Sequence, residues 1–444
     1  MRDDREVADL ALVHGGRTIV AGRLRRLLPR GPIWHRGDFV RLWSAATVSN
    51  LGTQVSLLAI PFVAIKSLHA TTLEVAALGA AGSAPLLLFG LPAGAWVDRL
   101  RKRPVMLAGD LGCCLALGSI PIARAAGALT IWQLFAVEFA SAGLTIFFDV
   151  ASQANLPAVV TRDELAAGNA ALQVSAQTAQ VAGPGLAGLL IGLVGAPFAV
   201  AADAASYLAS ASIVSRVRHV EPPRERVEGR RLRAEIGEGL RFVLGHPIIR
   251  PNLAFTATAN FFNSIFFSVF ILYAVRTLHL SARQVGLVFV CSNLGSLATA
   301  TLAPRLHRRF GLGRVMLATS LSGWPLLLVF FARGTGDWRI PMLVAGVFVW
   351  ASAAVIFNIT STTISQATTP DGMLARSASS RRLVAWGTIL PATMLGGVLG
   401  TYLGLPTTVL VGAAGRGLAG LIILRSPVRH VRTLEDADAI VATV

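Results

Sequence analysis

Two acidic residues stand inside long apolar stretches, where a charge is costly. Glu138 lies within the apolar run that starts near Ile131, at a depth of about 10 Å at helical rise. Asp203 is similarly deep in a later run. Removal from water favours the neutral form of a carboxyl group, which suits a group that binds and releases protons. We predict Glu138 and Asp203 as candidate proton-coupling residues; a structural ion pair or an outward-pointing side chain is the alternative for Glu138.

A short loop between two apolar runs concentrates charge of both signs. It holds one acid and a series of bases, and a further acid, Asp149, lies near the end of a later apolar run. Opposite charges at neighbouring helix ends form charge-assisted hydrogen bonds. We predict an ionic cluster built from Asp98, Arg99, Arg101, Lys102, Arg103 and Asp149, with Gly94 at the start of the same loop.

Amide side chains form a third set of polar residues inside apolar runs. Such an amide either lines a polar pathway or hydrogen-bonds a neighbouring helix, and both interpretations stay open. Phenylalanines between Phe261 and Phe267 would add aromatic surface beside them. A lining of amides and aromatic rings suits an amphipathic organic molecule better than a sugar or a small ion. The candidates are Asn50, Gln54, Asn260, Asn263 and Asn358.

The elements that must position these residues are membrane-spanning helices. The chain has 444 residues, of which 54% are apolar and only 14% charged, and its mean hydropathy is +0.62. A soluble protein of this size would need more surface charge. Apolar runs of about 20 residues predict an all-α membrane protein with twelve transmembrane helices. The predicted spans are about 39–65, 75–96, 104–126, 131–150, 165–194, a sixth ending near 214, 252–273, 285–302, 315–331, 341–364, 383–403 and 406–424.

The placement of the bases predicts the orientation. The net charge is +17, and most of the 40 Lys and Arg fall in alternate short loops between the spans. Under the positive-inside rule these loops are cytoplasmic, which places both termini inside the cell. Because the bases lie beside apolar spans, we predict the lipid bilayer as a partner and no nucleic acid. Cys113, Cys114 and Cys291 all lie in apolar spans and predict no disulfide framework.

The chain divides into five segments. Residues 1–38 are predicted as a cytoplasmic arm, 39–214 as a first six-helix half, 215–250 as a cytoplasmic linker, 251–424 as a second half and 425–444 as a tail. In the linker, apolar residues from Leu232 to Leu244 recur at helical spacing with charges between them. This pattern predicts an amphipathic helix, which lies either on the membrane surface or under the bundle.

Two internal repeats support the division into halves. Residues 152–157 and 365–370 share the pattern Ser-Gln-Ala-x-x-Pro at the ends of spans four and ten. Residues 99–103 after span two match the basic residues 305–309 after span eight. Such matches at corresponding places are typical of a duplicated six-helix unit. The copies differ, since Pro304 stands where Asp98 would be.

The loop cluster resembles the Gly-x-x-x-Asp-Arg-x-x-Arg-type motif of the major facilitator superfamily, filled here by Gly94, Asp98, Arg99 and the pair Lys102 and Arg103. Arg101 stands where many members have Gly. The resemblance implies a fold of two six-helix halves. It also implies that the cluster meets the start of span eleven and acts as a gate; a static ion network is the alternative.

Further stretches resemble one bacterial branch of that superfamily, with enterobactin-exporter-like and macrolide-efflux-like members. The stretch 182–188, with Gly183, Pro184 and Gly188, is similar to the span-five motif of drug exporters, and 147–157 is similar to the branch's span four. Proline and glycine there predict a bend or a close helix contact. The resemblance implies that span six is peripheral, which favours a structural role for Asp203.

We therefore predict a secondary transporter and no enzyme. It would export a small amphipathic molecule (a drug, siderophore or secondary metabolite) across the bacterial inner membrane by proton antiport, as a monomer. The chain has no Gly-x-x-x-x-Gly-Lys-Ser/Thr loop, so we expect the proton gradient rather than ATP to drive it. We predict no cofactor and no metal site. The alternatives are an importer, and a transport-inactive membrane sensor or assembly protein. Arg416 in span twelve has no role assigned from the sequence.

Overall fold

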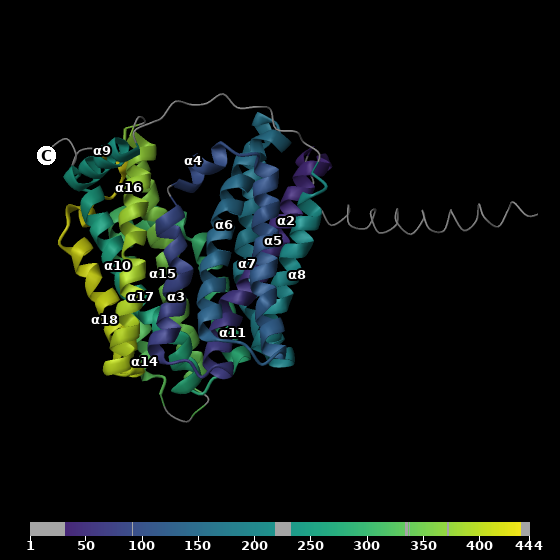
Figure 1. Cartoon of the computed structure of the whole chain (residues 1–444). Helices are drawn as coiled ribbons and strands as arrows, with labels where there is room; N and C mark the ends of the chain where they lie inside the picture. The colour runs from purple at the N-terminus through teal and green to yellow at the C-terminus, as the bar shows by residue number, and fades with distance from the viewer. Residues whose placement is uncertain are drawn as a thin grey trace, which may run out of the picture.

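The computed structural model describes residues 32–436 except 91, 218–231, 334–335, 337 and 371–372. Most of the predicted arm and residues 218–231 of the predicted linker lie outside the described residues. The side chains of Asp98 and of residues 232–236 also lie outside them. The described residues form helices and no strand. Eleven helices are long and apolar enough to cross a membrane, and a bent pair makes a twelfth (Figure 1). The all-α fold predicted from the sequence is confirmed.

The first half contains six membrane-length helices and one short one. α2 continues without a break into a π-helical turn, and α4 is the short helix that follows α3. The bounds are α2 (Gly37–Phe62), η2 (Val63–Ser67), α3 (Thr72–Phe89), α4 (Pro92–Asp98), α5 (Lys102–Ala125), α6 (Ile131–Val159), α7 (Leu165–Val194) and α8 (Ala196–Val214), with η1 (Pro32–His35) and η3 (Arg162–Glu164) before α2 and α7.

The second half follows the same order with more breaks. α11 and α12 together make one span, bent by 54°. The bounds are α10 (Ile249–Arg276), α11 (Ala282–Ala300), α12 (Ala303–Phe310), α13 (Leu312–Ser320), η4 (Trp324–Leu326), α14 (Leu327–Phe331), α15 (Arg339–Ala367), α16 (Leu374–Gly387), α17 (Ile389–Tyr402), α18 (Leu405–Leu424) and η6 (Pro427–His430).

Two predicted spans are not continuous helices. The predicted span 75–96 was wrong beyond Phe89, because Pro92 has no N–H to continue the helix and starts α4 instead. The predicted span 315–331 breaks between Ser320 and Trp324. There Gly323 lies against the backbone of Gly417 in α18, so closely that a Cβ would overlap it. The break lets α13 and α14 fit against a neighbouring helix.

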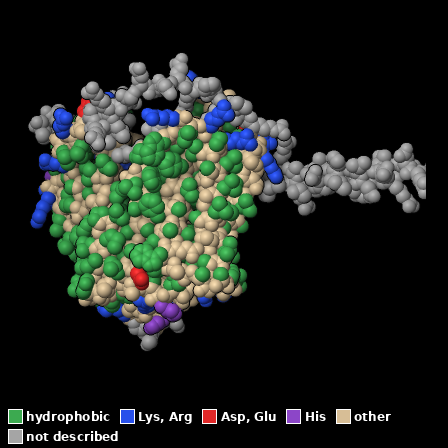
Figure 2. All heavy atoms as spheres, viewed as in Figure 1, with side chains coloured by type: hydrophobic (Ala, Val, Ile, Leu, Met, Phe, Trp, Pro, Cys, Tyr) green, Lys and Arg blue, Asp and Glu red, His purple; other side chains and the backbone are tan. Residues whose placement is uncertain are grey.

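Charge and burial define two ends of the bundle. We call the end that carries α4, α9 (Leu232–Gly245) and the start of α5 the basic end, and the opposite end the distal end. Figure 2 shows a broad band of hydrophobic side chains on this face, with Lys and Arg gathered toward the basic end. Large apolar side chains such as Leu115 and Ile122 are 75% and 71% exposed on the outer surface. Such exposure fits a surface that faces lipid.

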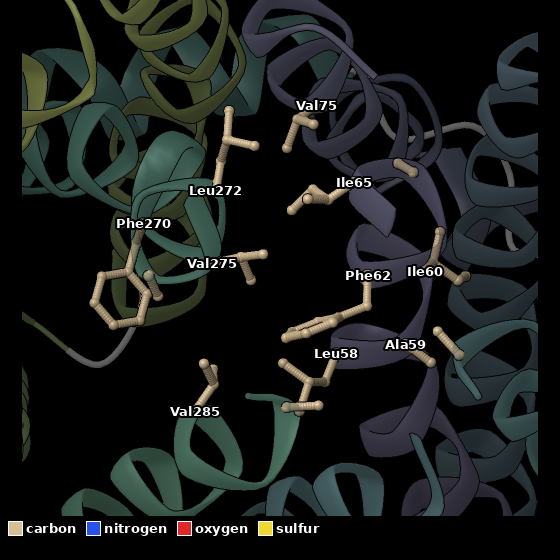
Figure 3. Close-up of a cluster of buried hydrophobic side chains, with 14 of the residues drawn as sticks. Leu58, Ala59, Ile60, Phe62, Ile65, Val75, Phe270, Leu272, Val275 and Val285 are labelled. Carbon is tan, nitrogen blue, oxygen red and sulfur yellow. The ribbon is translucent and has the colours of Figure 1, made fainter. Parts of the chain in front are cut away.

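The two halves meet in an apolar cluster at the distal end. Figure 3 shows Phe62, Ile65 and Val75 from the first half facing Leu272 and Val275 from the second. All five are buried. Burial of apolar surface holds the halves together here. We call this cluster the distal seal.

One polar contact accompanies the distal seal. The Arg276 guanidinium, at the end of α10, donates a hydrogen bond of 2.6 Å to the carbonyl oxygen of Ala70 in the first half. A second contact between the halves lies deeper, where Asn293 Nδ2 donates to the Gln180 carbonyl at 2.7 Å. Both bonds satisfy backbone carbonyls across the boundary between halves.

The linker helix α9 packs under the second half. Glu238 of α9 forms an ion pair of 2.7 Å with Arg376 of α16. A Cβ on Gly239 would lie 2.6 Å from the Arg376 carbonyl oxygen, so the two helices touch at their backbones. Buried Val243 packs with Ile249 and Leu253 of the second half. The sequence predicted this helix either on the membrane surface or under the bundle, and the contacts place it under the bundle.

His246 joins α9 to the start of α10. Its Nδ1 accepts the backbone N–H groups of Ile248 and Ile249 at 3.3 and 3.2 Å, and its Nε2 lies 3.3 Å from the Thr368 carbonyl oxygen. Burial lowers the pKa of the His246 ring. A neutral ring with Nε2 protonated satisfies all three contacts and caps α10.

Candidate functional site

Glu138 lies on α6 with its carboxylate directed at α3. Its Oε2 is 3.0 Å from the point that a Cβ on Gly82 would occupy, so glycine at that position makes room for the carboxylate. None of the ion pairs among the described residues involves Glu138. The alternative for Glu138, a structural ion pair with a base, is therefore absent among the described residues.

Asp203 belongs to a buried polar face of α8. It is only 1% exposed and accepts a hydrogen bond of 3.2 Å from Ser206. One turn further, the Tyr207 hydroxyl is 2.9 Å from Thr53 of α2 and 3.3 Å from Thr145 of α6. The α8 helix thus presents hydrogen-bonding groups to two neighbouring helices.

The same face of α8 reaches a carboxylate that sequence reasoning left without a role. Ser210 donates a hydrogen bond of 2.7 Å to Asp110 of α5. Asp110 is fully buried, and its other oxygen, Oδ1, has no hydrogen-bond partner. The spacing of Asp203, Tyr207 and Ser210 at helical intervals was the signal that could have predicted one polar face. The first half therefore buries several acids without a matching base.

The predicted ionic cluster lies at the α4–α5 turn. The Lys102 side chain is 4% exposed, and its Nζ donates to the carbonyl oxygens of Val97 and Leu100 at 2.8 and 2.9 Å. Arg103 donates to the Ser215 carbonyl at the end of α8. These bonds tie α5 to the preceding turn and to α8.

Other members of the predicted cluster are placed differently. Arg99 and Arg101 are exposed, and Asp149 is also exposed, with no ion-pair partner among the described residues. The side chain of Asp98 lies outside the described residues. Arg101 has φ −69° and ψ 128°, an ordinary extended conformation, so the turn does not need the glycine common at this position.

The glycines of α7 mark close helix contacts. Gly183 lies against Gln54 of α2, leaving no room for a Cβ. A Cβ on Gly188 would lie 2.7 Å from the Ala282 carbonyl oxygen of α11. Pro184 lies within the continuous helix α7, with its carbonyl oxygen close to Gly286 of α11. This stretch therefore forms the contact between α7 and helices of both halves.

Three of the five predicted amides line one cavity in the second half. Asn260, Asn263 and Asn358, from α10 and α15, share a cavity of about 360 Å³. Asn260 also donates a hydrogen bond of 2.9 Å to the Ala385 carbonyl. The remaining lining residues are Thr256, Ala259, Trp350, Ala354, Phe357, Ser361, Ala385, Trp386 and Arg416. The structure thus brings distant amides together at one place.

The other predicted lining residues lie elsewhere. Gln54 packs against α7, and Asn50 is half-buried on α2; neither lines the cavity. The phenylalanines predicted to add aromatic surface also do not line it. Phe266 is fully buried against Gly412 of α18, and Phe262 lies against Gly415. These two rings pack against α18 because its glycines leave room for them, whereas Phe267 packs against Trp350, a residue that lines the cavity.

Sequence reasoning missed the aromatic and cationic residues of this cavity. Trp350, Phe357 and Trp386 supply its rings, and Arg416 supplies a positive charge. At helical rise Arg416 lies about 12 Å from the basic end of α18 and about 16 Å from its distal end, which is mid-depth. The signal in the sequence was a lone arginine inside an apolar span, which usually faces a cavity. Among the described residues, no group of His, Cys, Asp and Glu is arranged to hold a metal.

The fold and the mid-depth cavity define a membrane transporter of the major facilitator type. The family model described as transmembrane secretion effector matches residues 31–441, and the chain belongs to this family.

Relatives of known or named function agree with that class. The chain is 25% identical to the multidrug efflux pump Tap of Mycolicibacterium fortuitum, over 91% of this chain and 98% of that protein. It is 26% identical to the enterobactin exporter EntS of Citrobacter koseri, over 74% of this chain and 78% of that protein.

Solved structures share the fold. The nucleoside transporter NupG superposes with a TM-score of 0.69 at 14% identity, covering 87% of this chain and 97% of that one. A bacterial homologue of the iron transporter ferroportin in an inward-facing state gives 0.66 at 18% identity, covering 87% and 98%. The predicted superfamily and fold are confirmed.

Proposed function

We propose that this protein exports a small amphipathic organic molecule in exchange for protons, by alternating access to a single mid-depth site. The observation that carries the proposal is the amide- and aromatic-lined cavity at mid-depth, in a bundle whose halves are sealed at the distal end. The efflux functions named for Tap and EntS favour export of organic molecules. Since one chain supplies both halves, we expect a monomer to be sufficient.

The basic end faces the cytoplasm of the bacterium in this proposal. Bases gather at that end, as the positive-inside rule requires. In this orientation α2 begins on the cytoplasmic side, and α18 ends on the same side. With the distal end sealed, cargo would reach the cavity from the cytoplasmic side.

Proton coupling is assigned to the acids within the spans of the first half, with Glu138 as the principal candidate. It lies near the distal side, from which protons would enter, and faces α3 without a base beside it. A carboxyl group in such a place can alternate between charged and neutral forms as the halves move. Asp203 is the second candidate, held in a hydrogen-bonded network that favours a structural role.

The ionic cluster is proposed as a gate at the basic end. When the halves close there, Asp98 and Asp149 would meet cations and the positive start of a second-half helix. Asp98→Asn keeps the shape and removes the charge, so we expect transport to fall at least 10-fold with normal amounts of protein in the membrane. Asp163→Asn, which changes an exposed acid at the same end, is the matched control. Normal transport by Asp98→Asn would leave the cluster a static network.

Everted membrane vesicles test the function directly. With an acid interior, they should accumulate at least one compound from a panel of amphipathic drugs and siderophores, and an uncoupler should abolish the accumulation. Accumulation in right-side-out vesicles or cells instead would indicate an importer. Absence of flux for every compound, together with a stable protein partner, would indicate a sensor or assembly protein.

A further inference from the structure

The charge of Arg416 has no counter-ion inside the second half. Between Glu238 and Glu435 the sequence contains only two acids, Asp337 and Asp371, and neither falls within the bounds of a helix. The helices α10 to α18 therefore contribute no carboxylate at mid-depth. None of the ion pairs among the described residues involves Arg416. A charge buried in this way is costly unless something of opposite charge meets it.

Neutral groups hold the guanidinium in place. Its Nη1 donates to the Ser320 carbonyl oxygen at 3.2 Å, and its Nη2 donates to Ser322 Oγ at 3.1 Å. The guanidinium carbon lies 4.9 Å from the centre of the Phe255 ring. These contacts fix the position of the side chain, which is 5% exposed, but they use only two of its five N–H donors. The remaining donors are available to a ligand in the cavity that Arg416 lines.

Two further polar atoms of this cavity have no hydrogen-bond partner. The Trp350 indole Nε1 and the Asn263 Oδ1 are both buried and unpaired. A buried donor or acceptor without a partner costs about 1–3 kcal/mol. The residues that line the cavity thus include a buried N–H donor and a buried oxygen acceptor without partners, together with the cation of Arg416. This set suits an occupant with an anionic group and further polar atoms.

The walls of the cavity favour an aromatic or apolar body. Trp350, Phe357 and Trp386 line it, and the Phe267 ring lies 5.0 Å from that of Trp350. Aromatic rings of a ligand pack well between such side chains. A volume of about 360 Å³ is in the range of small organic ligands.

A second arginine lies on α16, one helical turn from the cavity toward the basic end. Arg381 stands one helical turn before Ala385, a lining residue of α16, on the same face of that helix. Its Nε is buried without a hydrogen-bond partner. Successive positive charges along a path attract anions from solution.

We propose that this cavity binds the cargo and that the cargo is an aromatic anion, a carboxylate, sulfonate or phosphate whose charged group is held by Arg416. The inference rests on the proposed function for the identity of the cavity as the cargo site. It goes further by selecting aromatic anions over the neutral and cationic compounds that an amphipathic lining alone would accept.

A binding experiment on the unmodified protein tests the selection by charge. The full chain in lipid nanodiscs is titrated with 1-naphthaleneacetate and with 1-naphthaleneacetamide, which differ in charge and little in shape. Binding is followed by calorimetry. We expect the acid to bind at least 10-fold more tightly than the amide. Equal affinities, or no binding by aromatic carboxylates, sulfonates and phosphates alike, would overturn the proposal.

A substitution assigns the selection to Arg416. Arg416→Gln should weaken binding of 1-naphthaleneacetate about 10- to 100-fold and leave the amide within about threefold, since one charge-assisted contact is lost. Arg416→Lys, which keeps the charge, should retain part of the preference for the acid. Arg333→Gln is the matched control, because Arg333 also stacks on a phenylalanine ring but lies outside the cavity. Undiminished acid binding by a folded Arg416→Gln protein would refute the assignment.

Vesicle transport separates this inference from the proposed function. Export of neutral or cationic compounds, with no export of aromatic anions, would support the proposed function and overturn this inference. Selective binding of 1-naphthaleneacetate without flux of any compound would support the anion site and overturn the proposed export function.

Discussion

Gly188→Ala should shift the protein toward a state that is open at the distal end. Gly188 of α7 faces the start of α11, and its added Cβ would lie 2.7 Å from the Ala282 carbonyl oxygen and 3.1 Å from Arg283 Cα. Ordinary Cβ contacts begin at 3.4 Å. The two helices must therefore separate by about 0.7 Å, and backbone atoms cannot rotate away as a side-chain tip can.

The size of the effect follows from the packing. Overfilling a well-packed contact costs about 1–3 kcal/mol. This cost applies where α7 and α11 touch, at the distal side, and is relieved when the distal end opens. A difference of that size multiplies the ratio of distal-open to distal-closed protein about 5- to 150-fold. Gly79→Ala is the matched control, since its Cβ would lie 3.5 Å from Thr393 Cγ2 at the other contact between halves.

Distances between spin labels measure the shift. Labels at Ala128 and Tyr402, exposed at the distal ends of the two halves, are read by double electron–electron resonance in a cysteine-free background. We expect a longer distance to gain population in Gly188→Ala and the control to match the parent protein. Both variants gain the same helix propensity, so their difference isolates the contact. An unchanged distance distribution and an unchanged melting midpoint for Gly188→Ala would refute the tight packing between α7 and α11.

Three further predictions concern topology, coupling and stability. An impermeant thiol reagent added to intact cells should label a cysteine at position His69 and not one at Arg101; labelling at Arg101 would reverse the proposed orientation. Glu138→Gln should stop gradient-driven export while downhill exchange survives, because an amide cannot alternate in charge, and gradient-driven accumulation at the parent level would remove Glu138 from coupling. Gly412→Ala should lower the melting midpoint, because its Cβ would lie 2.8–2.9 Å from backbone and Cβ atoms of Phe266 at a cost of about 1–3 kcal/mol. In Gly387→Ala the added Cβ would have no atom within 4 Å, so this variant should not lower the melting midpoint. Equal melting midpoints for the two variants would contradict the argument.

The internal repeats show how far local sequence reasoning extends to structure. Ser152 and Ser365, at the same place in the shared pattern, are both buried near the ends of α6 and α15. The basic repeats differ, because residues 99–101 form a turn while residues 305–309 lie within α12. In α12 the His307 ring reaches Thr360 of α15 at 2.8 Å, whereas Lys102 and Arg103 donate to backbone carbonyls of the preceding turn and of Ser215. Duplication is visible in the sequence, and divergence of contacts is visible only in three dimensions.

The sequence by itself determined the class of protein, the number of spans and the duplicated plan, because apolar run length and basic loops respond to the membrane and not to neighbouring helices. It also singled out Asn260, Asn263 and Asn358 as polar residues in apolar helices. Only the tertiary structure decided that these amides share a cavity while Gln54 does not. The tertiary structure also decided that Arg416 lines the same cavity, which depends on the rotational orientation of α18 against α10. That rotation is set by glycine contacts such as Gly412 with Phe266, and side-chain packing between distant segments is not encoded in the periodicity of either helix alone.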